Sequence, residues 1–576
     1  MGSRSAVGLL VAFVACAPED VYQPNVRTGG GGSTTTHAAG PRVALGATVL
    51  LQPSGRVVAT NPDTDTVRLL VHAPDGSLRP STEISLGAGA RPTVTAGTKG
   101  FVVVARGTGS LAWFGASGAL LQQTKVCSEP RGVALDAAEA VALVACASGE
   151  LVTVSSSGEV TNTLETSFDL RDVLRFDATT AWVTTHRSAQ VLQLDRASGG
   201  VLTTLVSPGV TTPTGLHFSP QVAARTVLVG EVAYMAHQLE LDGDVRQLTA
   251  PGTVPGPVPV VPQYYGAGNG CMTSVVSVAL TRFDLRPGHF AATTVALPGA
   301  VPVDVAVQGP WAAVATMGGL STVITDAWVP TTGCGTVASN FLTLQPPLAV
   351  GLPTPAVPGP IPVPMVLTRD SLGGYDLHAP TEEPAARALF HTQSPSGVAC
   401  QSCHAEGYDD GHVWTFEQPV RTQSLEGGLL ATAPFHWKGE LQGFADVVHL
   451  TFETRMGGHL PADLSANDLG AWLDTLPARQ KPMGDVSAGE KLFTTAGCAT
   501  CHAGASLTSN ATVDVGTGGA FQVPSLRGVG FRGPWMHSGC AKTLAQRFDP
   551  ACGGKEHGGP VAPADVPELV RYLQSL

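Results

Sequence analysis

The chain has 576 residues, long enough for more than one domain, and it contains 68 glycines and 44 prolines but few aromatic residues. This composition favours a turn-rich β protein over a helical one. The formal net charge of −12, without a basic stripe, argues against nucleic acid as a partner.

The first sixteen residues are typical of an export signal. Arg4 precedes a short apolar run, residues 6–15, that is too short to cross a bilayer as a helix. The run ends in Phe-Val-Ala-Cys and resembles the lipobox of bacterial lipoproteins, which implies that Cys16 is lipidated and becomes the mature N-terminus. Plain secretion is the alternative. Residues 17–43 contain a Gly/Ser/Thr run and are predicted to be a flexible linker.

Residues 44–377 repeat a pattern of two β-rich runs around a polar turn. Most repeats are spaced close to the roughly 40 residues expected of a four-stranded propeller blade. Eight such units begin at Val57, Phe101, Val141, Thr180, Val227, Thr273, Trp311 and Met365. The pattern predicts an all-β propeller of seven blades, with eight blades as the alternative. A pair of β-sandwiches is the second alternative, because sandwiches do not require a fixed period.

The first of these units, VVATNPDTDTVRLL, resembles the strand-turn-strand signature of YVTN/YncE-type propellers. The resemblance implies a platform that docks ligands or partners and carries no chemistry. The proline-rich residues 345–364 are expected to form an insertion or an edge segment. His186, His217 and His237 are scattered, and we interpret them as surface or loop residues rather than a metal site.

Two copies of the pattern C-x-x-C-H follow the predicted propeller, and this pattern is the attachment sequence for c-type haem. The two thiols form thioethers with one porphyrin, and the histidine binds the iron on its proximal side. A disulfide or a zinc site is the alternative, but a zinc site needs further Cys or His ligands nearby. The sequence therefore predicts two covalently bound haem c groups, attached to Cys400, Cys403 and His404 and to Cys498, Cys501 and His502.

Each motif lies within one of two similar halves, residues 378–480 and 481–576, offset by about 98 to 101 residues. Helices are predicted before each motif and at the end of each half, with Ser465 as an N-cap. The segment VSAGEKLFTTAG resembles the N-terminal helix of class I cytochromes c, with Gly489, Leu492 and Phe493 at its packing positions. We therefore expect mainly α tandem class I cytochrome c domains.

The alignment of the halves also suggests the sixth ligand of each iron. Met456 lies 52 residues after His404, and His557 lies 55 residues after His502. We predict His404/Met456 for the first iron and His502/His557 for the second, which would give the two irons unequal potentials. The competing ligands are His412, His436 and His459 for the first iron and Met536 and His537 for the second.

The segment FQVPSLRGVGFRGPWMHSG resembles one found in bacterial di-haem cytochrome c peroxidases and their MauG relatives. The match is carried by Val523, Pro524, Ser525, Leu526, Arg527, Pro534, His537 and Gly539. A fainter copy in the first half consists of Arg421, Ser424, Leu425, Pro434 and Gly439. The resemblance implies electron transfer between two haems and, in the family's enzymes, reduction of hydrogen peroxide at one open iron.

The sequence departs from this family in two respects. The haem motifs are closer together, and no methionine follows His537 at the family's ligand distance. The acid–base residue that a peroxidase needs is not singled out by the sequence. Glu417, Glu426 and Glu440 are the candidates, and a solvated surface carboxylate is the plainer interpretation of each.

The chain has eleven cysteines, of which one is assigned to lipid and four to haem. An even remainder of six in an exported chain indicates disulfides. Pairing neighbours in sequence predicts Cys127–Cys146, Cys271–Cys334 and Cys540–Cys552.

We therefore expect a di-haem c-type cytochrome that transfers electrons, and an oxidoreductase of the peroxidase/MauG type that reduces hydrogen peroxide. One alternative is an electron-transfer cytochrome without a substrate. Another is a binding protein whose propeller recognises a protein or ligand. The expected partner is a redox protein of the cytochrome or cupredoxin type. The expected location is the bacterial cell envelope, with a lipid anchor in the periplasm or at the outer membrane surface.

Overall fold

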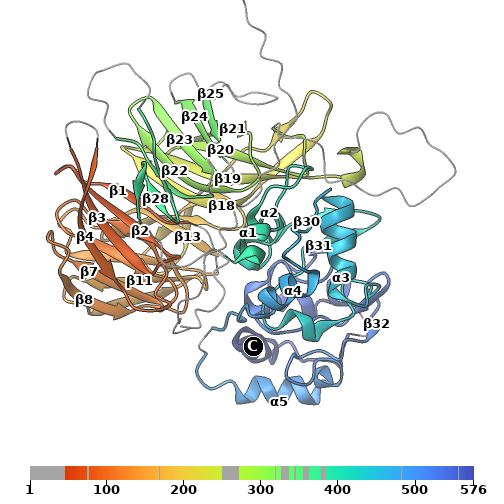
Figure 1. Ribbon diagram of the computed structural model, residues 1–576. Coiled ribbons are helices and arrows are strands. Elements are labelled where there is room, and N and C mark those ends of the chain that lie inside the picture. The colour runs from red at the N-terminus through yellow and green to blue at the C-terminus, as the bar shows by residue number, and fades with distance from the viewer. Residues whose placement is uncertain are drawn as a thin grey trace, which may run out of the picture. The chain divides into compact units, whose positions relative to one another are not determined.

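The computed structural model describes residues 46–73, 77–167, 169–248, 271–317, 319–325, 337–342, 346–353, 362–377, 384–481, 483–554 and 557–576 (Figure 1). The predicted signal segment, Cys16 and the predicted linker lie outside these residues. Across the described ranges, no helix is both long and apolar enough to span a membrane.

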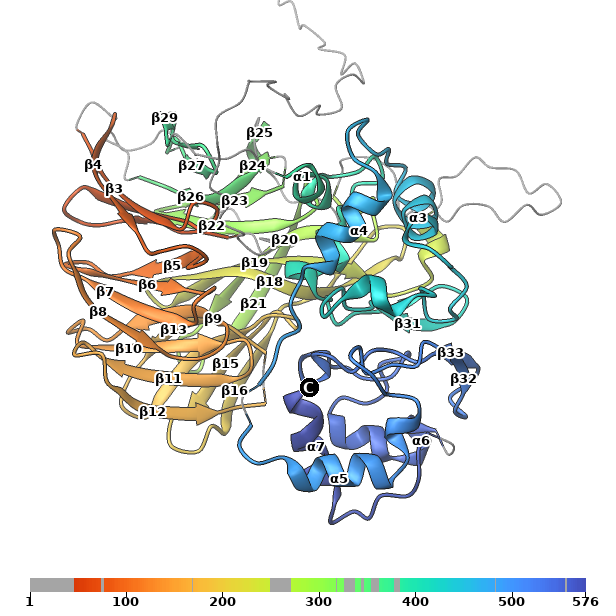
Figure 2. The ribbon, with the colours of Figure 1, turned by 60° about the horizontal axis from the view of Figure 1, so that its bottom comes forward.

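Seven antiparallel sheets form a seven-bladed β-propeller, which confirms the predicted propeller of seven blades. In each sheet the strands pair in chain order, so every blade is one continuous stretch of chain (Figure 2). The strands of blades one to four are β1 (Val49–Leu51), β2 (Arg56–Asn61), β3 (Thr66–His72), β4 (Leu78–Ser85); β5 (Pro92–Ala96), β6 (Phe101–Ala105), β7 (Ser110–Phe114), β8 (Leu120–Lys125); β9 (Pro130–Leu135), β10 (Val141–Cys146), β11 (Glu150–Ser155), β12 (Val160–Glu165); β13 (Leu170–Phe176), β14 (Thr180–Thr185), β15 (Gln190–Asp195) and β16 (Val201–Val206).

Blade five has five strands, and blades six and seven have four each. Their strands are β17 (Val210–Thr211), β18 (His217–Val229), β19 (Val232–Leu241), β20 (Val276–Asp284), β21 (Ala291–Leu297); β22 (Pro302–Gln308), β23 (Trp311–Thr316), β24 (Gly319–Ile324), β25 (Val337–Leu342); β26 (Pro347–Gly351), β27 (Met365–Thr368), β28 (Ser371–Leu372) and β29 (Tyr375–Asp376). The 3₁₀ turn η1 (Val245–Leu248) follows β19.

Eight β-rich units make seven blades because two of them belong to the same sheet. The units beginning at Val227 and Thr273 contribute β19 and β20, which pair along their length from Val232 opposite Asp284. The proline-rich segment supplies β26, which lies at the edge of the last sheet, where proline is tolerated. The rest of that segment between residues 354 and 361 lies outside the described residues.

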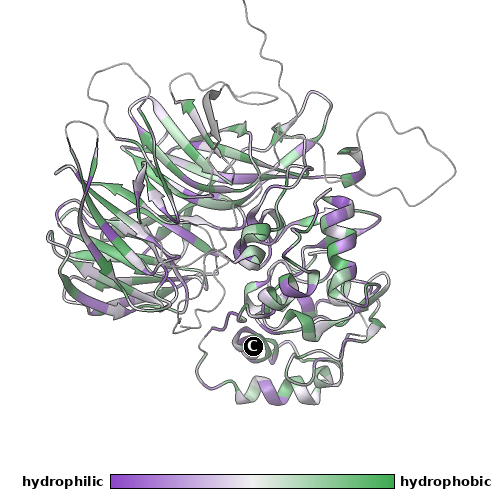
Figure 3. Ribbon diagram, viewed as in Figure 1, coloured by the Kyte–Doolittle hydropathy of each residue, from purple (hydrophilic) through white to green (hydrophobic). Residues whose placement is uncertain are grey.

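The middle strands of the blades are buried and the outer ones are exposed. Every residue of β6 and β7 is buried, whereas β8 is exposed over almost its whole length. Figure 3 shows the corresponding contrast in hydropathy between strands. Burial on both faces accounts for the Val- and Ala-rich middle strands, since neighbouring blades pack against both sides of each sheet.

Within the described residues, side chains and loops close the ring, and the sheets of the first and last blades share no strand. The backbone N–H of Ala47 donates to the carbonyl of Leu348 at 2.9 Å. The Asn61 amide, in the turn of the YVTN-like unit, donates to the carbonyl of Arg369 at 3.0 Å. One hydrophobic cluster joins blades six, seven and one across this closure.

The C-terminal part consists of short helices, 3₁₀ turns and two small β ribbons. Its first half contains α1 (Ala385–His391), α2 (Cys400–Cys403), η2 (Ala405–Gly407), β30 (Val413–Thr415), β31 (Pro419–Arg421), η3 (Leu429–Thr432), α3 (Phe444–Val447), the π-helical η4 (Val448–Arg455) and α4 (Ala466–Asp474). Its second half contains α5 (Ser487–Thr495), η5 (Cys498–Thr500), β32 (Thr512–Asp514), β33 (Ala520–Gln522), η6 (Val529–Phe531), η7 (Leu544–Phe548), α6 (Pro550–Gly553) and α7 (Val566–Ser575).

The predicted flanking helices are present, but the expectation of a mainly α part is corrected. Ser465 caps α4, because its hydroxyl accepts the backbone N–H of Asp468 at 3.1 Å. The longest α-helix in this part, α7, has only ten residues. Glycine-rich stretches between the helices favour turns and short ribbons instead of longer helices.

The two halves repeat each other in backbone geometry as well as in sequence. His436 and Met536, one hundred residues apart, both have φ of 67°, and Gly439 and Gly539 both have φ of 65°. These residues lie in a turn that is flanked in each half by an isolated antiparallel β-bridge. The bridge joins Phe435 to Leu441 in the first half and Trp535 to Ala541 in the second. The repeat is therefore structural, extending through the loops between the helices.

Candidate functional site

Each C-x-x-C-H motif forms a single helical turn that ends at its histidine. The N–H of His404 donates to the carbonyl of Cys400 at 2.9 Å, and that of His502 donates to the carbonyl of Cys498 at 3.0 Å. The four motif cysteines are free thiols rather than disulfides. Both motifs therefore present two thiols and one imidazole from a compact turn.

The two motif histidines have the same hydrogen bonding. Nδ1–H of His404 donates to the carbonyl of Tyr408 at 3.4 Å, and that of His502 donates to the carbonyl of Leu507 at 3.2 Å. Burial lowers the pKa of His404 and lowers that of His502 to about 4, so both rings are neutral at pH 7. A neutral histidine that donates through Nδ1 is the form that binds a metal through Nε2.

Both motifs line one cavity of about 940 Å³. Its walls include Cys403 and His404 from the first half and Cys498, Cys501 and His502 from the second. The volume is at the upper end of the roughly 300–1,000 Å³ typical of small-molecule and cofactor pockets. The structure thus brings together five of the six residues predicted to attach haem in one largely apolar space.

His502 and His557 face each other across part of this cavity. Their ring centroids are 6.3 Å apart, with the ring planes inclined by 38°. Two imidazoles that bind one iron from opposite sides have centroids on the order of 6 Å apart, because each metal–nitrogen bond is about 2.0–2.1 Å. The spacing therefore leaves room for one iron between the two rings.

The first half has a different arrangement around Met456. This residue is 3% exposed and packs in a hydrophobic cluster with Leu389 and Phe390. It is absent from the residues that line the cavity, whereas His404 is among them. The sequence-equivalent residues Met456 and His557 therefore do not occupy equivalent environments.

The competing ligands of the first half are also separated by the fold. His412 does not line the cavity, because its Nδ1 lies 3.2 Å from Oε2 of Glu240 in the propeller. His459 is exposed and lies outside the cavity walls. His436 does line the cavity, and its Nδ1–H donates to Glu440 at 3.1 Å.

In the second half both competing ligands line the cavity. His537 stacks on Phe521 with centroids 3.9 Å apart, and its carbonyl accepts the N–H of Arg421 at 2.7 Å. The indole N–H of Trp437 in turn donates to the carbonyl of Arg421 at 2.8 Å. The His537 segment thus joins the two halves.

All three candidate acid–base carboxylates line the cavity, but they differ in environment. Glu426 is buried and paired with Arg479 at 3.0 Å and with Arg532 at 3.4 Å. Burial raises its pKa, but the two guanidinium groups outweigh burial and hold the pKa of Glu426 below its ordinary value. Glu417 and Glu440 are exposed enough to exchange protons with solvent.

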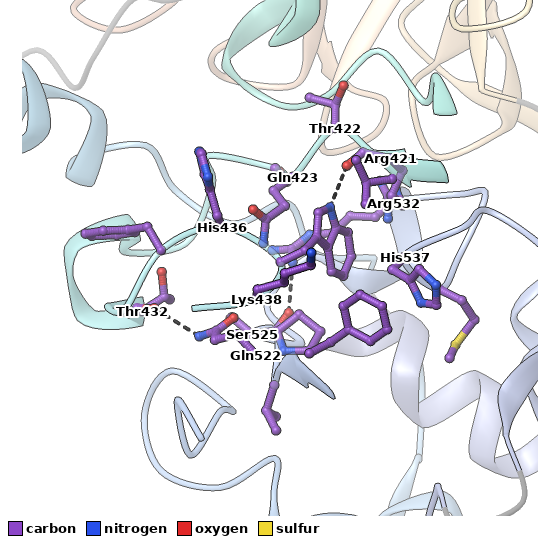
Figure 4. A pocket seen from close by; sticks show the side chains of 18 of the residues that line it. Arg421, Thr422, Gln423, Thr432, His436, Lys438, Gln522, Ser525, Arg532 and His537 are labelled. Atoms are coloured by element: carbon purple, nitrogen blue, oxygen red, sulfur yellow. Dashed lines mark hydrogen bonds between the residues drawn. The ribbon is translucent and has the colours of Figure 1, made fainter. Parts of the chain in front are cut away.

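Two buried arginines in the cavity wall are further candidate site residues, and the sequence pointed to one of them, Arg421, only through the resemblance. Arg421 and Arg532 line the cavity, and Figure 4 shows them near His537, with Lys438 and His436 also in view. Arg421 also pairs with Asp409 at 3.1 Å. Cationic groups in such a wall suit the carboxylates of a cofactor. The sequence carries no signal for this role, because burial of an arginine depends on distant segments.

Elsewhere, the structure contains the disulfides Cys127–Cys146 and Cys540–Cys552. The predicted pairing of Cys271 with Cys334 involves a residue outside the described ranges. His186 lies in the loop between β14 and β15, although it is buried, and His217 is exposed, as the interpretation expected. His237 is buried within β19 and hydrogen-bonded to Thr281, which corrects the interpretation for that residue.

In the part of the chain that the structure describes, no three or more His, Cys, Asp or Glu side chains converge as metal ligands would. A haem iron takes only two axial ligands from the protein, so a haem site does not require such a cluster.

No protein-family model and no curated protein matches the chain. Hydrazine synthase from Kuenenia stuttgartiensis is 17% identical with a TM-score of 0.37, over 56% of this chain and 93% of that chain. The C-terminal WD40 domain of Sif2 is 10% identical with a TM-score of 0.35, over 54% and 91%. Virginiamycin B lyase from Staphylococcus aureus is 10% identical with a TM-score of 0.36, over 55% and 89%. Likenesses this distant carry no argument about function.

Proposed function

We propose that the protein is a di-haem c-type cytochrome that transfers electrons and reduces hydrogen peroxide, in the manner of the peroxidase/MauG family. The observation that carries the proposal is the presence of both C-x-x-C-H motifs at one cavity, each with a buried, neutral histidine in the cavity wall.

The residues at this cavity fit two haem c groups. All four motif thiols are free, three of them line the cavity, and the cavity is large and mostly apolar. Arg421 and Arg532 present cations that suit haem carboxylates. When bound, haem supplies an iron that accepts and returns single electrons.

We assign different tasks to the two halves. His502 and His557 would hold the second iron, and that site would then carry electrons without binding a substrate. In the first half the equivalent residue, Met456, packs in the hydrophobic core. The space beside His404 then suits a small substrate, and the sequence prediction of Met456 as a ligand remains the competing assignment.

Reduction of one hydrogen peroxide to two waters takes two electrons and two protons. A redox protein of the cytochrome or cupredoxin type is the proposed electron donor. His436 and Glu440 share a hydrogen bond at the cavity wall and are placed to supply protons from solvent. We propose the cell envelope as the location, with Cys16 as the lipid anchor, because haem c is attached outside the cytoplasmic membrane.

A second candidate function is electron transfer without a substrate, with the propeller binding a protein or ligand partner. The spacing of His502 and His557 favours it, since an iron held by both residues would have no place for peroxide.

Counting haem by the pyridine haemochrome assay tests the cofactor. We expect two haems per wild-type chain, and one in each of the double variants C400S/C403S and C498S/C501S. The double variant C127S/C146S removes a disulfide instead and should retain both haems. A wild-type chain without haem would overturn the proposal.

A redox titration followed by EPR separates the two candidate functions. A high-spin iron that appears on half-reduction, together with peroxide turnover, supports the peroxidase. Two low-spin irons in every redox state without turnover support the electron-transfer protein.

A further inference from the structure

A buried carboxylate beside the first haem motif reaches into the propeller. Glu406 follows His404 by two residues and is 6% exposed. Its backbone is left-handed, with φ of 58° and ψ of 19°, a conformation that non-glycine residues rarely adopt. Surrounding contacts must hold the residue in this conformation, because it is unfavourable by itself.

Three arginines provide those contacts. Arg106 donates to Oε1 of Glu406 at 2.6 Å, Arg131 donates to Oε2 at 2.9 Å, and Arg171 donates to Oε1 at 3.2 Å. All three arginine side chains are at most 9% exposed, and that of Arg131 is completely buried. Such charge-assisted hydrogen bonds are stronger than neutral ones.

The three arginines come from three successive blades. Arg106 follows β6 in blade two, Arg131 lies in β9 of blade three, and Arg171 lies in β13 of blade four. Each arginine lies in a strand of its blade or directly after one. The propeller therefore fixes the position of the Glu406 side chain, and the loop that contains Glu406 does not.

Two further carboxylates lie beside the arginines that hold Glu406. Glu129 pairs with Arg106, and Asp169 pairs with the buried guanidinium group of Arg131. The nearby His186 has Nε2 3.8 Å from Glu406, and burial lowers its pKa to about 4, so it adds no charge at pH 7. Arg187 also pairs with Asp169 at 3.5 Å, so each of the three carboxylates is held by at least one guanidinium group.

We propose that Glu406 is a positioning residue through which the propeller holds the first haem-binding segment and sets the electrostatic potential at the first iron. This inference rests on the proposed function. It gives the propeller a role in the redox site. At the position where Glu406 enters the propeller, the propeller binds this side chain instead of a ligand.

The proposal predicts the sign of a change in potential. Glu406→Gln removes one negative charge from a buried site, where electrostatic interactions are weakly screened. Oxidised iron carries one more positive charge than reduced iron, so the variant should raise the midpoint potential of the first haem. Arg106→Gln should lower it, and the double variant should return it toward the wild-type value.

Spectroelectrochemical titration of the full-length protein tests these signs. The first haem is assigned by repeating each measurement in the C498S/C501S background, which retains that haem alone. Glu159→Gln is the matched control, because it removes the same charge at an exposed position of the propeller that does not line the cavity. The control should leave the potential close to that of wild type.

Opposite shifts in the two single variants, with the second haem unchanged, would support the proposal. Two attached haems with unchanged potentials in both variants would overturn it while leaving the proposed function intact. Absence of haem from the wild-type chain would overturn the proposed function itself. If Glu406→Gln fails to accumulate, Arg106→Gln decides alone: a lower potential supports the proposal, and an unchanged potential overturns it.

Discussion

At the scale of single residues, the surroundings of a side chain decide its role more than its type does. His412 and His557 are both histidines downstream of a haem motif. The fold pairs His412 with Glu240 of the propeller and directs His557 toward His502. Only the second arrangement suits an axial ligand.

His557→Ala tests that assignment. Both haems should remain attached, because the thiols are untouched, but one low-spin signal in the EPR spectrum should be replaced by a high-spin signal. The exposed His459 provides a control, since His459→Ala should leave the spectrum unchanged. An unchanged spectrum for His557→Ala would show that another residue binds the second iron.

Asp304 should make the stability of the propeller depend on pH. It is 3% exposed in β22, and burial raises its pKa to about 7. Between about pH 4 and pH 7 the folded protein holds a proton that the unfolded chain has released, so stability decreases as pH rises. The contribution amounts to at most about 4 kcal/mol.

Asp304→Asn should remove this dependence and stabilise the protein at pH 8 relative to wild type. The asparagine oxygen can still accept the N–H of Val350, which donates to Asp304 at 2.9 Å. Urea denaturation at pH 5 and pH 8 measures the difference, with the exposed Asp463→Asn as control. Parallel pH profiles for wild type and Asp304→Asn would contradict the prediction.

At the scale of elements, the first and last helices of each half cross and pack against each other. In the second half Phe493 of α5 contacts Tyr572 of α7, with ring centroids 5.3 Å apart. In the first half Phe390 of α1 contacts Trp472 of α4 at 5.6 Å. The repeated aromatic pair indicates that both halves use the same helix crossing.

Gly489 permits that crossing in the second half. A Cβ at this position would lie 2.3 Å from the carbonyl oxygen of Glu568 and 2.6 Å from Cβ of Tyr572. Gly489→Ala should therefore destabilise the protein by about 1–3 kcal/mol, despite the higher helix propensity of alanine. Gly484→Ala, at a position with open space, should change stability by less than about 0.5 kcal/mol. Equal stabilities in thermal denaturation would contradict this account of the crossing.

At the scale of the whole molecule, the described blades form a ring that is closed by packing instead of a shared strand. Leu348 in β26 is buried in the cluster that joins blades six, seven and one. Leu348→Ala should cost about 2–5 kcal/mol in unfolding free energy. Leu121→Ala, at a side chain that is 60% exposed, should cost far less. Similar denaturant midpoints for the two variants would indicate that this seam does not limit stability.

The sequence by itself determined the features that depend on neighbouring residues. The C-x-x-C-H spacing, the cap at Ser465 and the alternating strands are local patterns, and each was readable without a partner segment. The repeat period also predicted the propeller. It left the choice between seven and eight blades open, because the pairing of β19 with β20 bridges residues far apart in the chain.

Tertiary structure decided which distant groups meet. It placed His557 opposite His502, kept Met456 in the core and joined Glu406 to arginines some 235 to 300 residues away. These outcomes could not be read from the sequence because burial and charge pairing depend on long-range packing, and many exposed positions would accept the same residue types.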